Sequence, residues 1–127
     1  IFDPIKNELF YAEKDKGAFF KNQRIRVSKK NNINECLFAT GKIDNKLDFT
    51  YRRTGSAALD MAYVASGRFG GYFQHNLNLW DIAAGIIIVK EAGGIVNEID
   101  LANIKNLKVL ASSVEINAKL IEKLGNF

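Results

Sequence analysis

The chain has 127 residues, 47% of them hydrophobic, and a formal net charge of +4. This length is typical of a single domain, and this apolar content excludes an intrinsically disordered chain. The longest apolar run, residues 82–89, is too short to span a bilayer. No basic and apolar leader opens the sequence, so we expect a soluble, cytoplasmic protein without a signal peptide.

The positive charge is concentrated in one part of the chain. Residues 1–54 hold 12 basic and 7 acidic side chains, whereas residues 55–127 hold 6 and 7. Two short basic pairs lack interleaved aromatic residues, so they indicate a solvated basic surface rather than nucleic-acid binding. These pairs are Lys29-Lys30 and Arg52-Arg53. The single cysteine, Cys36, lies in an apolar run and is expected to be a buried, unreactive thiol.

Apolar periodicity and turn residues predict alternating strands and helices. We expect strands at residues 8–13, 24–27, 36–40, 71–74, 95–99 and 107–111, and helices at residues 57–65, 81–92 and 113–124. Ser56 is a natural N-cap for the first helix, and Gly67 ends it. The second helix is apolar nearly all round, so we expect it to be buried. This interleaving is typical of a layered α/β or α+β fold.

One acidic residue, Asp81, lies at the start of the apolar helix and beside the only tryptophan, Trp80. A carboxylate in the first turn accepts backbone N–H bonds and complements the helix dipole, so a capping role is the simplest interpretation. At the rim of a site, the same carboxylate would instead hold a divalent cation. We expect Trp80 to be a packing anchor. Small residues that let a neighbouring segment approach closely follow at Ala83, Ala84 and Gly85.

A second group of candidates lies at the start of the first predicted helix. Gly55-Ser56-Ala57 would leave backbone N–H groups free to bind a phosphate or a sugar hydroxyl, with an ordinary cap as the alternative. Gln74 ends a predicted strand and is able to bond a polyol hydroxyl. The only histidine, His75, has no partner in the sequence for a nucleophilic triad, and we assign it no role.

Three segments together point to a known family. Residues 53–68 (RTGSAALDMAYVASGR) are similar to the middle helix of the inositol monophosphatase family, and more narrowly of its bacterial extragenic suppressor proteins. Residues 80–94, with WDIAAG followed by EAGG, are similar to its second signature. Residues 2–19 resemble the strand pair after the family's Asp-Pro-Ile-Asp-Gly-Thr loop. The Asp-Pro-Ile run at Asp3 lacks the rest of that loop, so we interpret it as a turn.

This resemblance implies a fold, an activity and a set of ligands. The fold would be a layered αβαβα sandwich of which residues 1–127 form the C-terminal half, with residues 1–40 ending the first sheet region and residues 51–127 forming the C-terminal α/β part. The activity would be Mg²⁺-dependent hydrolysis of inositol 1-phosphate, a small phosphorylated polyol, in a homodimer. Asp81 would be a Mg²⁺ ligand that also touches the substrate hydroxyls.

The resemblance also assigns substrate contacts to Gly55, Ser56, Ala57 and Gln74. The family usually has a glutamate at the position of Gln74, where it binds the polyol ring. Glutamine keeps the capacity for hydrogen bonds but loses the charge.

Other features of the family are missing. The first metal carboxylates, a Glu-Glu pair and the Asp-Pro-Ile-Asp-Gly-Thr loop, belong upstream of Ile1, and the polar stretch at residues 42–50 is shorter than the family's helical excursion there. Because Mg²⁺ needs several oxygen ligands and Asp81 supplies one, we expect the chain alone to be inactive. We also expect the isolated chain to leave a sheet edge and face uncovered, and therefore to need a partner or to aggregate.

Two other interpretations remain open. One is a non-catalytic module for dimerisation or regulatory binding in RNA metabolism or transcription. The lesser one is a fructose-1,6-bisphosphatase or nucleotide phosphatase of the same superfamily.

Overall fold

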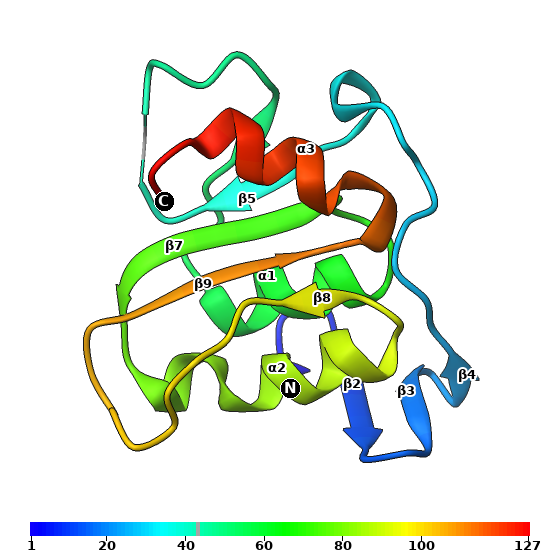
Figure 1. Cartoon of the computed structure of the whole chain (residues 1–127). Coiled ribbons are helices and arrows are strands. Elements are labelled where there is room, and N and C mark those ends of the chain that lie inside the picture. Colours follow the sequence, from blue (N-terminus) through cyan, green and yellow to red (C-terminus); the bar gives the residue numbers. More distant parts are fainter. Residues whose placement is uncertain (43) are drawn as a thin grey trace.

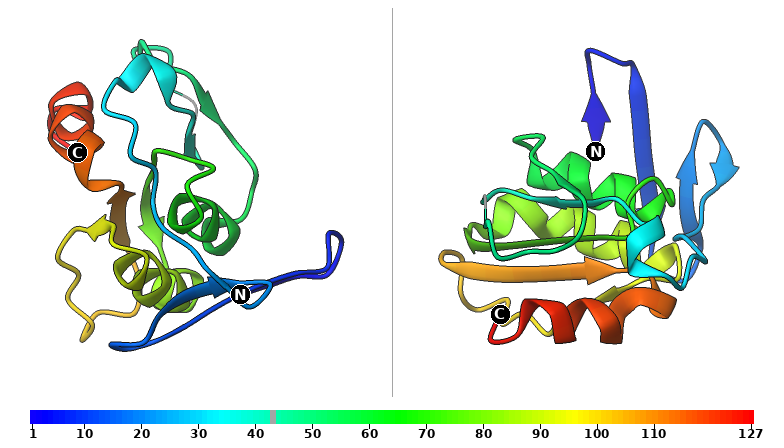
Figure 2. Two further views of the ribbon diagram at one scale, coloured as in Figure 1. Left: turned by 90° about the vertical axis from the view of Figure 1, so that its right-hand side faces the viewer. Right: turned by 90° about the horizontal axis from the view of Figure 1, so that it is seen from above.

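The computed structural model describes residues 1–42 and 44–127, and these residues fold into four layers (Figures 1 and 2). A four-stranded sheet packs on a helix pair, which covers one face of a five-stranded sheet, and a third helix lies on the other face. The helices are α1 (Ala57–Ala65), α2 (Leu79–Glu91) and α3 (Val114–Leu124). This β-α-β-α order confirms the predicted layered fold.

The first sheet is antiparallel, in the order β1-β2-β3-β4. Its strands are β1 (Phe2–Asp3), β2 (Glu8–Glu13), β3 (Gly17–Phe20) and β4 (Gln23–Arg24). The predicted turn at Asp3 is confirmed, because its Oδ1 accepts hydrogen bonds from the backbone N–H groups of Ile5 and Lys6 at 2.9 and 3.3 Å. The predicted strand at 24–27 is wrong beyond Arg24, since the Val27 N–H bonds the Ala92 carbonyl at the end of α2 instead of a strand.

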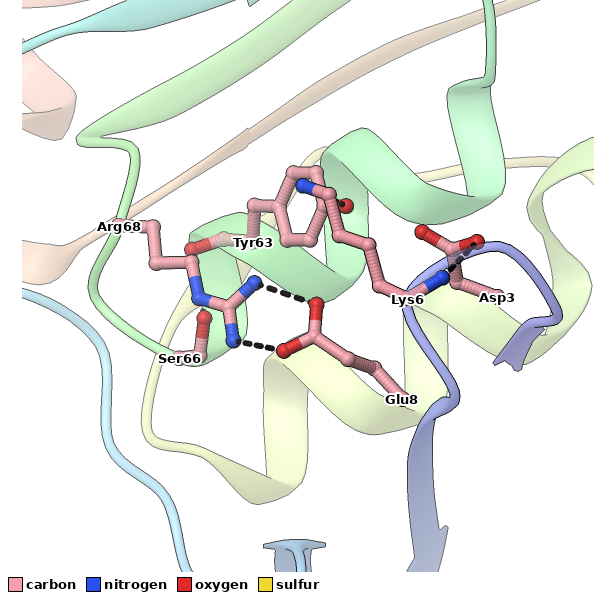
Figure 3. Close-up of polar contacts among 6 residues, drawn as sticks. All are labelled: Asp3, Lys6, Glu8, Tyr63, Ser66 and Arg68. Carbon is pink, nitrogen blue, oxygen red and sulfur yellow. Dashed lines mark hydrogen bonds and ion pairs between the residues drawn. The ribbon is translucent and has the colours of Figure 1, made fainter.

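Polar contacts join this sheet to α1 and to the segment that follows it (Figure 3). The Arg68 guanidinium donates two hydrogen bonds to the Glu8 carboxylate, at 3.0 and 2.8 Å, which lowers the pKa of Glu8. The same guanidinium lies over the rings of Phe10 and Tyr63, 5.4 and 4.9 Å from their centroids. Lys6 Nζ donates to the Tyr63 hydroxyl at 3.4 Å. These contacts fix the sheet against the helix layer.

The second sheet has the order β6-β5-β7-β9-β8. Its strands are β5 (Phe38–Thr40), β6 (Tyr51–Arg52), β7 (Gly71–Leu77), β8 (Ile95–Val96) and β9 (Leu107–Ser112). The change of sheet therefore falls before β5, so residues 38–40 pair with the C-terminal part of the chain. The predicted strand at 95–99 stops early because the Asn97 side-chain Oδ1 accepts the Leu110 N–H at 2.7 Å and replaces a ladder bond.

Helix α1 has its predicted bounds, but the burial of α2 differs from the prediction. Its buried residues lie on one face, and Trp80 on the opposite face is 65% exposed. Trp80 is therefore not a packing anchor, because its helical position points it away from both α1 and the second sheet. Of the three small residues after Ile82, only Gly85 lies close to the neighbouring helix, because a Cβ on Gly85 would lie 2.6 Å from Met61 Sδ of α1. The other two, Ala83 and Ala84, are exposed.

The hairpin of β1 and β2 stands out from the body of the molecule (Figure 2). It exposes Phe2, Ile5 and Leu9 by 55%, 92% and 50%. Apolar side chains exposed together in this way are typical of a surface that a partner covers. Among the residues described here, no helix is both long and apolar enough to cross a membrane.

Candidate functional site

Asp81 lies in the first turn of α2, where its carboxylate caps the helix. Its Oδ2 accepts a hydrogen bond from the Asn78 backbone N–H at 3.0 Å, and its own N–H donates to the Asn78 carbonyl at 3.0 Å. A carboxylate at this position satisfies an unpaired N–H group and complements the helix dipole. The carboxylate therefore accepts a backbone N–H bond at the helix start, as predicted, but the N-cap residue is Asn78 and Asp81 is the third residue of α2, because the helix begins two residues before the predicted start at residue 81. Within residues 1–42 and 44–127 the second carboxylate oxygen, Oδ1, accepts no hydrogen bond and is available to a ligand.

The start of α1 is built from small residues, as predicted. The Ser56 hydroxyl accepts a hydrogen bond from the Leu59 N–H at 3.2 Å and so caps the helix. Gly55 has a φ of +93°, in the left-handed region that glycine adopts without strain. In the described part of the chain, the N–H groups of Ala57 and Ala58 have no protein acceptor. Unpaired donors at a helix start attract anionic oxygen atoms.

These elements meet at a cavity of about 350 Å³. Its wall includes every residue that the sequence singled out for the site: Gly55, Ser56, Ala57, Gln74 and Asp81. Arg53 adds a positive charge to the wall. Convergence of a carboxylate, free backbone donors and an amide on one concavity suits a small polar ligand. Their contacts with a metal or a substrate remain predictions.

Strand β7 reaches the cavity through an irregular segment. Its pairing with β9 shifts register between Gln74 and Leu77, and Asn76 in between has a φ of +58°. Bulges of this kind bend a strand and re-aim its side chains. The segment places both Gln74 and Asn76 on the cavity wall, directly before the cap of α2. One irregular turn therefore positions two parts of the site.

Sequence reasoning missed one carboxyl group of the cavity wall, that of Asp60 in the first turn of α1. Asp60 is only 2% exposed, and its Oδ1 accepts a hydrogen bond from the Thr54 hydroxyl at 2.5 Å. Burial raises the pKa of Asp60 to about 6, although the Thr54 hydrogen bond opposes this shift. The available signal was one acid inside the apolar segment Ala-Ala-Leu-Asp-Met-Ala, since a buried acid needs a reason.

Two other residues considered in the sequence lie outside this cavity wall. The His75 ring packs against the Phe127 ring, with centroids 4.3 Å apart. Cys36 is 5% exposed, and burial raises the pKa of its thiol, which confirms the prediction of a buried thiol.

The residues present do not fit a complete magnesium centre. Mg²⁺ takes about six oxygen ligands in near-octahedral geometry. In the part of the chain that the structure describes, no group of three or more His, Cys, Asp or Glu side chains is placed to share one ion. Asp81 offers one free oxygen, whereas the Asp60 carboxyl is only 2% exposed and its Oδ1 already accepts the Thr54 hydrogen bond. The described residues supply at most one side of such a centre.

Comparison with known proteins places this geometry in a family. A Nus factor SuhB of Haemophilus influenzae is 38% identical over 98% of this chain and 53% of its own length. An inositol-1-monophosphatase of Caulobacter vibrioides is 34% identical over 97% of this chain and 56% of its own length. The crystal structure of the extragenic suppressor protein suhB of Bartonella henselae matches with a TM-score of 0.86 and 41% identity, over 97% of this chain and 56% of that protein.

The layered fold and these relatives define a protein of the phosphatase superfamily. The model of the inositol monophosphatase family matches residues 1–126, and the chain belongs to that family. The chain spans about half the length of the curated relatives it matches.

Proposed function

We propose that this chain forms one side of a Mg²⁺-dependent phosphatase site that hydrolyses inositol 1-phosphate, and that the 127-residue chain alone is inactive. The observation that carries this proposal is the cavity at which Asp81, the α1 start and Gln74 meet in a member of the inositol monophosphatase family. Among the described residues, no group of three or more His, Cys, Asp or Glu side chains is placed to hold one ion, which supports the inactivity of the chain alone.

Each group of the cavity has a task in this proposal. Asp81 Oδ1 would be one ligand of a divalent cation, whose chemistry when bound would be to activate water and to neutralise phosphoryl charge. The unpaired N–H groups at the α1 start and the Arg53 side chain hold anionic or hydroxyl oxygen atoms of the substrate. The cap from the Asn78 N–H keeps the Asp81 carboxylate in one orientation, which lowers the cost of ordering it on binding.

The proposal is tested by Mg²⁺-dependent release of phosphate from myo-inositol 1-phosphate. We expect the purified chain to release none above the rate without protein. If the chain releases phosphate and the Asp81→Asn variant does not, the chain holds a complete site. Turnover that Asp81→Asn leaves unchanged would point to a contaminating phosphatase.

A second candidate function is a non-catalytic one in transcription. It is favoured by the relative from Haemophilus influenzae, which is a Nus factor rather than a named enzyme. Direct binding of the purified chain to a purified transcription elongation complex tests it. Binding that persists in Asp81→Asn would support this second function, whereas loss of binding in that variant would tie the interaction to the cavity.

A further inference from the structure

Residues 53–55 connect the edge strand β6 to α1 and contribute to the wall of the candidate site. All three are exposed, and among the described residues their backbone groups make no hydrogen bond to another backbone group. A Cβ on Gly55 would have no atom of the described residues within 4 Å, so the turn lacks packing at this point. A connection without ladder bonds or packing is mobile unless side chains hold it.

Two hydrogen bonds through the Thr54 side chain hold this connection. The Thr54 hydroxyl donates to Asp60 Oδ1 at 2.5 Å, and the same hydroxyl oxygen accepts the Ser56 backbone N–H at 3.4 Å. Asp60 lies in the first turn of α1 and is only 2% exposed, so its carboxyl is a fixed point within the packed helix layer. The exposed turn is therefore tied to a buried anchor.

This tie sets the position of groups that would face a ligand. Arg53 directly precedes Thr54, whereas Gly55 and Ser56 follow it, and these three neighbours line the cavity. Without the Thr54 bond, the left-handed turn at Gly55, with a φ of +93°, would be free to adopt other conformations, since glycine populates many of them. Ordering the turn again on binding would then cost conformational entropy.

We infer that Asp60 is a positioning residue of the candidate site, which through the Thr54 hydroxyl holds residues 53–56 in the conformation that binds anionic and hydroxyl oxygen atoms. The inference rests on the function proposed for the cavity and adds the residue that preorganises one part of its wall. Neutral or ionised, the carboxyl keeps an acceptor for the Thr54 hydroxyl, so this role does not depend on its protonation state. It also gives a reason for an acid at a buried position of an apolar helix.

Binding of myo-inositol 1-phosphate to the 127-residue chain without Mg²⁺ tests the inference separately from turnover. The ¹⁵N-labelled chain is titrated and followed by NMR, and the heteronuclear NOE of Gly55 and Ser56 reports the order of the free turn. Thr54→Val removes the donor at an exposed position, so we expect the fold to be retained. We expect this variant to lower the NOE at both residues and to weaken binding about tenfold, because one hydrogen bond that orders the turn is lost.

Conservative variants separate positioning from a general loss of structure. Thr54→Ser keeps the donor and is expected to restore the NOE and to bring the affinity within about threefold of the parent chain. Thr50→Val removes a threonine hydroxyl just before β6, outside the cavity wall, and is expected to change neither quantity.

Variants of the anchor test the same bond from its other end. Asp60→Asn and Asp60→Ala both remove the charge, but only asparagine accepts the Thr54 hydrogen bond. We expect Asp60→Ala to bind about tenfold more weakly than Asp60→Asn. Adding Thr54→Val to Asp60→Ala is expected to cause no further loss, because the two side chains act through one bond.

An affinity and an NOE that Thr54→Val leaves unchanged would overturn the inference, as would a Thr54→Ser variant that behaves like Thr54→Val. Loss of binding in Asp60→Ala without any loss in Thr54→Val would also overturn it, because Asp60 would then contact the ligand directly. A parent chain that binds no myo-inositol 1-phosphate up to the solubility limit would overturn it as well. Thr54-dependent binding combined with phosphate release that does not depend on Asp81 would refute the proposed function and support the positioning role, so the two proposals fail separately.

Discussion

Replacing Asp60 by asparagine is expected to stabilise the protein at neutral pH. The folded state raises the pKa of Asp60 from 3.8 to about 6, chiefly by burial. A shift of about two pKa units corresponds to about 3 kcal/mol, since each unit is worth about 1.4 kcal/mol. Because the folded pKa is raised, the favourable contribution of Asp60 is fully present below pH 3.8 and is lost as the pH rises through about 6.

Asparagine retains an oxygen that accepts the Thr54 hydrogen bond and carries no charge at any pH. Linkage predicts that Asp60→Asn is more stable than the parent chain by about 1 kcal/mol near pH 4.5 and by about 3 kcal/mol near pH 7.5. Urea unfolding followed by far-ultraviolet circular dichroism measures both values. Glu98→Gln, on an exposed residue, is the matched control. A stability difference that does not change with pH, or a less stable Asp60→Asn at neutral pH, would refute the reasoning.

Two further predictions concern the packing of the helices and the exposed hairpin. Gly85→Ala would place a Cβ 2.6 Å from Met61 Sδ. We expect urea unfolding to show a free energy of unfolding lower by about 1–3 kcal/mol, despite the better helix propensity of alanine. Unchanged stability would show that α1 and α2 separate freely. The apolar hairpin surface is expected to make the chain self-associate in sedimentation, and Leu9→Lys, at a 50% exposed position, to reduce this association. A parent chain that stays monomeric at all concentrations would contradict the second prediction.

Features fixed by local chemistry were predictable from the sequence. Helix α1 has its predicted bounds because Ser56 caps it through a neighbouring N–H and Gly67 follows it in a left-handed conformation. The apolar run that follows Asp81 likewise predicted that this residue lies in the first turn of a helix. The five predicted site residues meet at one cavity, since the family resemblance carried the tertiary arrangement that local patterns do not contain.

Features that depend on distant residues were not predictable. The exposure of Trp80 follows from which face of α2 meets α1 and the sheets, and an apolar sequence on all sides does not specify that face. The placement of the Gln74 amide depends on Gly41, more than thirty residues earlier, where a Cβ would lie 2.1 Å from Oε1, and on the Tyr72 hydroxyl, which donates to Oε1 at 2.6 Å. The burial of Asp60 in α1 depends on tertiary packing that local sequence patterns do not specify. Residue 43, in the stretch predicted to be shortened, lies outside the described residues.

The role of Asp81 as a metal ligand is tested most directly by reconstitution. In this experiment, the chain is mixed with the complementary half of a family member that carries the Glu-Glu pair and the Asp-Pro-Ile-Asp-Gly-Thr loop. Phosphate release from myo-inositol 1-phosphate is followed with and without Mg²⁺. If Asp81 is one ligand of a shared metal centre, the mixture turns over only with Mg²⁺, each half alone is inactive, and Asp81→Asn in this chain reduces the mixture to background. Activity of the mixture that is indifferent to Asp81→Asn would contradict the assignment of this carboxylate.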